Sequence, residues 1–272
     1  MTSTPAADHA AMLNLHPERA FRGVTRLLFA ASVAATVACC VSMSSMQGMR
    51  MAGNWTMSMT WMRMPGQGWP GAAASFLGMW TVMMVAMMLP ALVPMLRRYR
   101  LAIGPMAGVR LGALTLYVGG AYFAVWVALG LIVFPLGVAL ATLAMRVPAI
   151  ASAVPVVTAL AVILGGASQF TDWKARQLAC CHGFPAKDAR LAPDASTAWR
   201  HGLRLGIRCI RCCAGLTAIL FVLGVMDLWV MTAVAAAITL ERQVTAGVRV
   251  ARGIGAVAVL TGVALLGHAI AA

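Results

Sequence analysis

Seven apolar runs constrain this chain more than any other feature of its sequence. A helix needs roughly 20 apolar residues to cross the hydrocarbon core of a bilayer, and helices satisfy their own backbone hydrogen bonds there. The runs cover residues 27–41, 72–96, 111–134, 148–170, 205–225, 228–240 and 253–271. We therefore predict an all-α fold, a polytopic transmembrane helix bundle with about seven spans. Since 228–240 is short and closely follows 205–225, six spans is the alternative, with 228–240 as a half-span or the second arm of a tight hairpin.

Composition supports lipid as the surrounding solvent. Apolar residues make up 61% of the chain and charged residues 10%, whereas soluble domains have about 45–50% and ~25%. A formal charge of +14 in a soluble protein would suggest nucleic acid, but here the basic residues lie in short segments beside the apolar runs. We expect the lipid bilayer as a partner and no nucleic acid.

The basic residues also predict an orientation. All but three of the 21 Lys and Arg residues fall within 19–26, 97–110, 174–211 and 242–252. With seven spans these segments share one side, which the positive-inside rule assigns to the cytoplasm. We predict a multi-pass protein of a bacterial inner (plasma) membrane, with a cytoplasmic N-terminus, an outside C-terminus and an uncleaved first helix. Residues 1–20 are then a cytoplasmic segment and 21–271 the transmembrane domain, with an outer connection at 43–71 and a cytoplasmic loop at 172–204.

Methionines crowd the outer connection. Eight lie between positions 43 and 64: Met43, Met46, Met49, Met51, Met57, Met59, Met62 and Met64. Thioether sulfur is a soft, neutral ligand that suits copper(I), so Met46, Met49 and Met51 are candidate ligands. An amphipathic segment at the membrane interface, anchored by tryptophans, explains the same residues equally well.

A second group of methionines lies within the span 72–96. Met79, Met83 and Met87 recur every four residues and share one helix face, and Met84 with Met88 forms an adjacent stripe. The stripes resemble the pore-lining pattern of eukaryotic copper transporters over this one helix. We include all five as candidate ligands, although packing explains any single methionine as well.

Cysteines form a third group. Cys209, Cys212 and Cys213 are spaced i, i+3 and i+4, so they share one helix face. The flanking Arg208 and Arg211 would favour thiolates, the metal-binding form. In a reducing cytoplasm such cysteines indicate metal ligands or redox thiols. Three residues of the cytoplasmic loop, Cys180, Cys181 and His182, complete the predicted site. Such a site suits copper(I) first and zinc second.

Three motifs carry a family resemblance over about residues 75–245. They are Trp80-x-x-Met83-Met84-x-Ala86-Met87-Met88-Leu89-Pro90; Gln169-Phe170-Thr171-x-x-Lys174 followed by 180–185; and Gly202 through Cys209-x-x-Cys212-Cys213, then Gly224-x-Met226-x-Leu228-Trp229-x-Met231 and Glu241. The chain resembles a bacterial family of predicted metal-binding integral membrane proteins, whose domain has no assigned function. It departs from the family where Asp172 and Trp173 replace Pro-Leu, and where Arg211 and Ala214 replace the Gly and Trp around the paired cysteines. The resemblance implies metal binding in the membrane.

Two acidic residues lie close to the apolar runs. Asp227 separates two runs and Glu241 ends the sixth. Because a carboxylate is costly in lipid, we expect both near an interface, with Glu241 and Arg242 as a helix-end charge pair.

Three functional classes fit these features. The first is binding or movement of a soft metal ion, most simply copper(I), through outer methionines and cytoplasmic-side cysteines. The second is a membrane thiol oxidoreductase using Cys209 and Cys212, and the third a non-catalytic assembly or delivery factor serving a metallochaperone or metalloenzyme. No phosphate-cradling loop is recognisable, so any transport is not driven by ATP in this chain. Enzymatic activity is left open by the oxidoreductase alternative, but we favour a protein that is not an enzyme and assign no catalytic or cofactor-binding residues.

Overall fold

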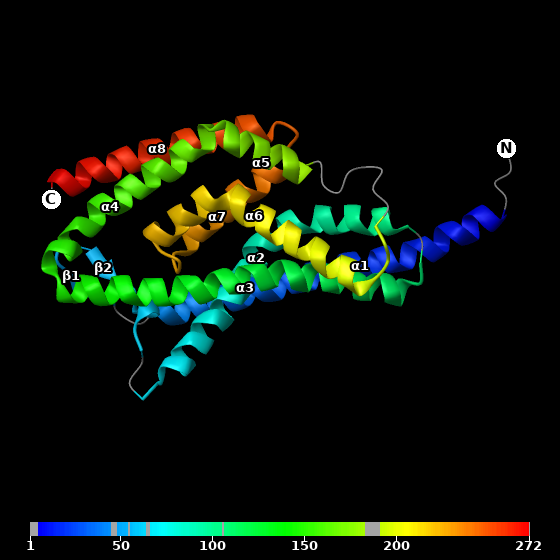
Figure 1. The fold of residues 1–272 in the computed structure, drawn as a ribbon, viewed down its shortest axis with the longest axis horizontal. Coiled ribbons are helices and arrows are strands. Elements are labelled where there is room, and N and C mark those ends of the chain that lie inside the picture. Colours follow the sequence, from blue (N-terminus) through cyan, green and yellow to red (C-terminus); the bar gives the residue numbers. More distant parts are fainter. Residues whose placement is uncertain are drawn as a thin grey trace.

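The computed structural model describes residues 5–44, 48–53, 55–63, 66–104, 106–182 and 191–271. Within these residues the chain forms eight α-helices and one short hairpin. The helices are α1 (Pro5–Ser44), α2 (Trp69–Ile103), α3 (Gly108–Arg146), α4 (Pro148–Ala167), α5 (Asp172–His182), α6 (Ala195–Leu223), α7 (Leu228–Gln243) and α8 (Gly247–Ala271). The helices form one elongated bundle (Figure 1). The prediction of an all-α polytopic bundle is confirmed.

Six of the described helices are long and apolar enough to cross a membrane, and α7 is not among them. Helix α7 has 16 residues, or about 24 Å at 1.5 Å per residue, against roughly 30 Å of hydrocarbon. The six long helices match the alternative count, and the expected short sixth span is the second arm of an α6–α7 hairpin. Gly224, at a positive φ of 132°, ends α6, and the Asp227 carboxylate caps α7 by accepting hydrogen bonds from the Trp229 and Val230 amides.

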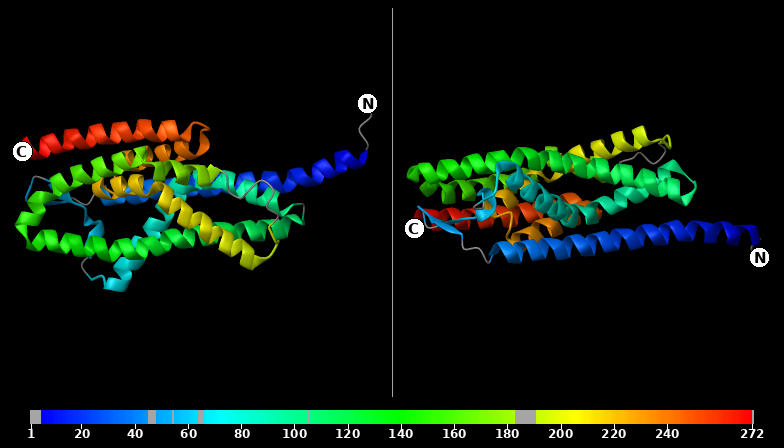
Figure 2. Two further views of the ribbon diagram at one scale, coloured as in Figure 1. Left: turned by 45° about the horizontal axis from the view of Figure 1, so that its top comes forward. Right: turned by 90° about the horizontal axis from the view of Figure 1, so that it is seen from below.

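Helix α1 starts at one end of the bundle's long axis, and α8 finishes at the opposite end (Figures 1 and 2). The hairpin of β1 (Met49–Met51) and β2 (Trp55–Met57) lies at the end where α8 finishes. Helices α3 and α4 turn at this same end, where the Trp55 indole donates a hydrogen bond to the Ala151 carbonyl (2.8 Å). Met57 is buried against Ala141 and Ala144 of α3. Packing therefore accounts for at least part of the methionine content of the outer connection.

The segment 172–204, predicted as a loop, is largely helical. Helix α4 passes through a 3-10 turn (Ser168–Phe170) into α5, and α6 already begins at Ala195. Asp194 caps α6: the Ser196 hydroxyl and the Thr197 amide donate to its carboxylate and lower its pKa to about 2. This segment carries a buried residue of the site, Lys174.

The core lies where α2, α3, α6 and α7 meet. Helix α2 buries Trp80 and its methionines there, and Trp80 fixes α2 to α3 by donating from its indole nitrogen to the Trp126 carbonyl (2.8 Å). Helix α3 also packs closely on α6, and α4 on α8. The sulfur-bearing faces of α2 and α6 consequently point inward.

Candidate metal centre

The three cysteines of α6 share a buried face, as their spacing predicted. Cys209, Cys212 and Cys213 are 1%, 2% and 1% exposed. Two glycines one and two turns earlier, Gly202 and Gly206, allow α3 to approach, because a Cβ on Gly206 would lie 3.0 Å from the Tyr122 carbonyl oxygen and 2.9 Å from the Val125 side chain. Small residues four apart are a common means of close helix packing in membranes.

The methionine stripes of α2 reach the cysteine face directly. Met83, Met84, Met87 and Met88 are buried, and Met79 is partly buried at the core's edge. The Cys209 Sγ lies 3.9 Å from the Met88 Sδ. The Met88 end of the stripe and the cysteine turn of α6 therefore meet in one place.

Cys209 is the best-connected thiol. The Tyr122 hydroxyl of α3 donates a hydrogen bond of 2.8 Å to its Sγ. The Cys213 thiol donates to the Cys209 carbonyl oxygen (2.9 Å), and the Cys209 and Cys213 side chains also interact with each other. The Cys209 thiol of α6 thus contacts Met88 of α2 and the Tyr122 phenol of α3, with Cys213 beside it.

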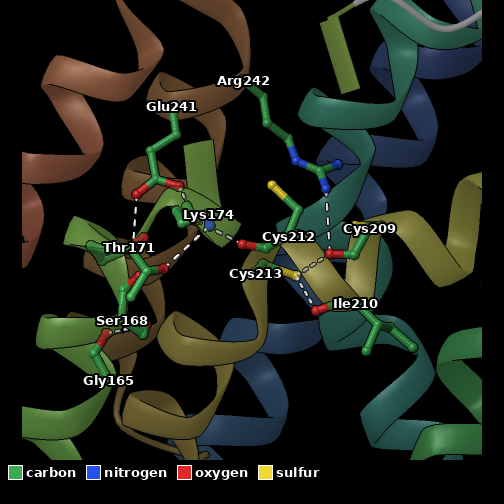
Figure 3. Close-up of polar contacts among 11 residues, drawn as sticks. Gly165, Ser168, Thr171, Lys174, Cys209, Ile210, Cys212, Cys213, Glu241 and Arg242 are labelled. Carbon is green, nitrogen blue, oxygen red and sulfur yellow. Dashed lines mark hydrogen bonds and ion pairs between the residues drawn. The ribbon is translucent and has the colours of Figure 1, made fainter. Parts of the chain in front are cut away.

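Buried charges surround the backbone of this turn (Figure 3). Lys174 of α5 donates from Nζ to the Cys212 carbonyl (2.7 Å) and pairs with Glu241 of α7 at 2.6 Å. Gln169 donates a further hydrogen bond of 3.0 Å to Glu241. Glu241 is buried, with 1% of the residue exposed. The close ion pair of Glu241 is thus with Lys174 of α5, in addition to the predicted influence of its neighbour Arg242.

Arg242 turns instead toward the cysteines, and its Nη2 donates to the Cys209 carbonyl at 3.4 Å. Arg211, expected to favour thiolates, is exposed and points away from the buried face. The cation next to the thiols thus comes from α7 rather than from α6. In the sequence, the only signal for these buried polar contacts is that charged residues stand next to apolar runs. The hydrogen-bond partners themselves lie 33 to 72 positions apart and cannot be paired from the sequence.

The loop residues predicted to complete a cysteine and histidine site do not join this cluster in the described part of the chain. The Cys180 thiol is exposed on α5, and the side chains of Cys181 and His182 lie outside the described residues. Among described residues, no group of three or more His, Cys, Asp or Glu side chains could hold a metal ion. The donor set that does assemble needs a thioether, which zinc uses poorly.

The outer methionines lie elsewhere. Met51 packs partly buried in a small apolar cluster with Met57 and Trp55, Met49 is exposed, and Met46 is outside the described residues. Neither Met49 nor Met51 lies in the core cluster that holds Met88 and Cys209.

The spacing of the two central sulfur atoms suits a shared ion. Metal–sulfur bonds are about 2.3 Å long, so two sulfur atoms 3.9 Å apart are close enough to bind one ion. Cys213, which interacts with Cys209 on the same turn, is a candidate third donor.

A family model described as PpoB2, copper chaperone, matches residues 77–265, which is more than half of the chain. The match includes the methionine stripes, the cysteine turn and the charged residues around it. Comparisons with curated proteins and with solved structures gave no match.

Proposed function

Because the chain belongs to the PpoB2 copper chaperone family, we propose that it binds copper(I) inside the membrane at Cys209, Cys213 and Met88. A role in copper handling follows from the family. The residues, the oxidation state of copper and the membrane location are the proposal. Zinc, the other ion considered, fits less well.

One observation carries this assignment: the 3.9 Å contact between the Cys209 and Met88 sulfur atoms. Both side chains are almost fully buried, at 1% and 0% exposed. Packing alone would favour such a pair only modestly, whereas mixed thiolate and thioether donors select copper(I). The Tyr122 hydrogen bond supports the same reading, since it stabilises a thiolate at Cys209.

The rest of the α2 stripe extends this site toward the outer end of the bundle. Met79, Met83, Met84 and Met87 precede Met88 on the same helix, and thioethers bind copper(I) without losing a proton. We propose that they pass the ion between the Met88 site and the outer connection, where Met46, Met49 and Met51 would meet it first. A metallochaperone or metalloenzyme is the proposed exchange partner.

The test is copper(I) titration of the purified protein in detergent, without oxygen, against a chromogenic copper(I) chelator. We expect a Cys209→Ser/Cys213→Ser double variant and a Met88→Leu variant each to bind copper(I) at least about tenfold more weakly, because each removes donors from a preformed set.

Matched controls are available on the surface. Cys180→Ser removes an exposed thiol and Met145→Leu an exposed thioether, so both should bind like the wild type. The assignment fails if the wild type binds no copper(I), or if the core variants bind it as tightly as these controls.

A further inference from the structure

Three buried charged side chains set the electrostatic field of the cysteine turn. Lys174 and Arg242 are cationic and Glu241 is anionic, and all three are buried. Lys174 touches the Cys212 carbonyl and Arg242 the Cys209 carbonyl, while Glu241 is held by Lys174 and Gln169. Two positive charges against one negative leave a fixed charge of about +1 next to the sulfur donors.

This charge acts where water does not screen it. Coulomb interactions between buried groups are several times stronger than between exposed ones, and an uncompensated buried charge is costly. Arg208 precedes Cys209 but is partly exposed, so its field at the site is screened more strongly. The thioether of Met88 is neutral, so it does not offset the fixed positive charge.

We infer that this fixed positive charge makes the site select a monovalent soft cation held by two thiolates, and reject divalent ions. The inference rests on the proposed function, since it concerns the ligand of the same site. A monovalent ion bound by two thiolates carries −1, which the fixed +1 cancels. The residues that determine the choice are Lys174, Glu241 and Arg242, none of which is a proposed donor to the ion.

A divalent ion on the same two thiolates forms a neutral complex, which gains no Coulomb stabilisation from the fixed +1. A third thiolate would cancel that charge. However, although Cys212 shares the buried face of α6, no three cysteine, histidine or acidic side chains of the described residues are placed to hold one ion, and Cys180 is exposed. Charge and donor geometry therefore both disfavour zinc(II) and copper(II).

The experiment compares silver(I), a redox-inert monovalent probe, with zinc(II) by competition titration of the purified protein in detergent. Arg242→Gln and, independently, Lys174→Gln each lower the fixed charge from about +1 to zero. Each variant should lower the silver-to-zinc preference on the order of tenfold, because the anionic silver(I) complex of two thiolates loses a favourable Coulomb interaction that the neutral zinc(II) complex does not have.

Two variants separate charge from structure. A Lys174→Gln/Glu241→Gln double variant removes the ion pair yet keeps the net charge of about +1, so its silver-to-zinc preference should stay within about threefold of wild type. Arg211→Gln removes an exposed arginine from the same helix and should have no effect.

The outcomes distinguish this inference from the proposed function. If the wild type binds neither ion, the site itself is refuted. If silver(I) binds and Cys209→Ser abolishes it, but the charge-lowering variants keep the wild-type preference, only the selectivity inference is overturned. A double variant that shifts as far as Arg242→Gln also overturns it, because structure rather than charge would then control the choice.

Discussion

At the scale of single residues, Tyr122 is the least obvious member of the site. Its ring is fully buried between α3 and α6, and its hydroxyl donates to the Cys209 sulfur at 2.8 Å. Sulfur is a weak acceptor unless it is ionised, so this contact is most favourable with a thiolate. Tyr122 thus acts as a positioning residue that keeps Cys209 oriented toward Met88.

We expect Tyr122→Phe to lower the free energy of unfolding by about 1 kcal/mol, the usual net value of one hydrogen bond, and to weaken copper(I) binding several-fold. Thermal unfolding in detergent and the copper(I) titration measure the two effects. Tyr117→Phe is the control, because Tyr117 is exposed on the same helix. Equal behaviour of the two variants would remove Tyr122 from the site.

At the scale of elements, the contact between α3 and α6 determines whether the site forms. Gly202 and Gly206 lie on the face of α6 that continues into Cys209 and Cys213. Close approach at Gly206 brings the Tyr122 turn of α3 next to the cysteine turn. The glycines therefore set the distance between α3 and α6, and with it the distance between Tyr122 and the cysteine turn.

Gly206→Ala should separate these helices and cost about 1–3 kcal/mol, the usual penalty of overpacking, with weaker copper(I) binding as a consequence. Gly120→Ala on α3 is the control, since nothing lies within 4 Å of a Cβ there, and it should be neutral or slightly stabilising. Thermal unfolding of both proteins decides the point, and an unchanged melting temperature for Gly206→Ala would contradict it.

The sequence predicted what depends on spacing within one helix, and missed what depends on pairing between helices. The shared face of Cys209, Cys212 and Cys213 follows from helical periodicity and is confirmed. The depth of Met88 does not follow, because α2 has 35 residues and is longer than a bilayer is thick, so its register was open. Lys174 was missed because its segment was interpreted as a loop, and Arg242 because its partner lies on another helix.

At the scale of the whole molecule, the bundle's long axis separates the two ends of the described chain. Helix α1 starts at the end of the bundle toward which α2 runs, where Arg100 of α2 pairs with Glu18 of α1, and α8 finishes beside the outer hairpin (Figure 1). The short α7 is the return arm between α6 and α8, so the two ends of the described chain lie at opposite ends of the bundle although six of its helices are long enough to span a membrane. The side of the membrane on which each end lies remains a prediction from charge.

Reporter fusions test that orientation. Alkaline phosphatase fused after α8 should be active, because it would lie outside the cytoplasm, whereas the same enzyme fused within the α2–α3 connection should be inactive. Fluorescent-protein fusions at the same positions should show the reverse pattern. Phosphatase activity at both positions would contradict the assigned topology.

Burial of the sulfur donors has a consequence for the speed of exchange. Cys209 and Met88 are at most 1% exposed, so an acceptor in solution cannot touch an ion held between them. The ion has first to move along the α2 methionines, or the helices have to separate, and departure is then a unimolecular event whose rate levels off as the acceptor becomes more concentrated. The residence time of the ion is therefore set by motions within the protein, and a delivery partner can hasten release only by changing those motions.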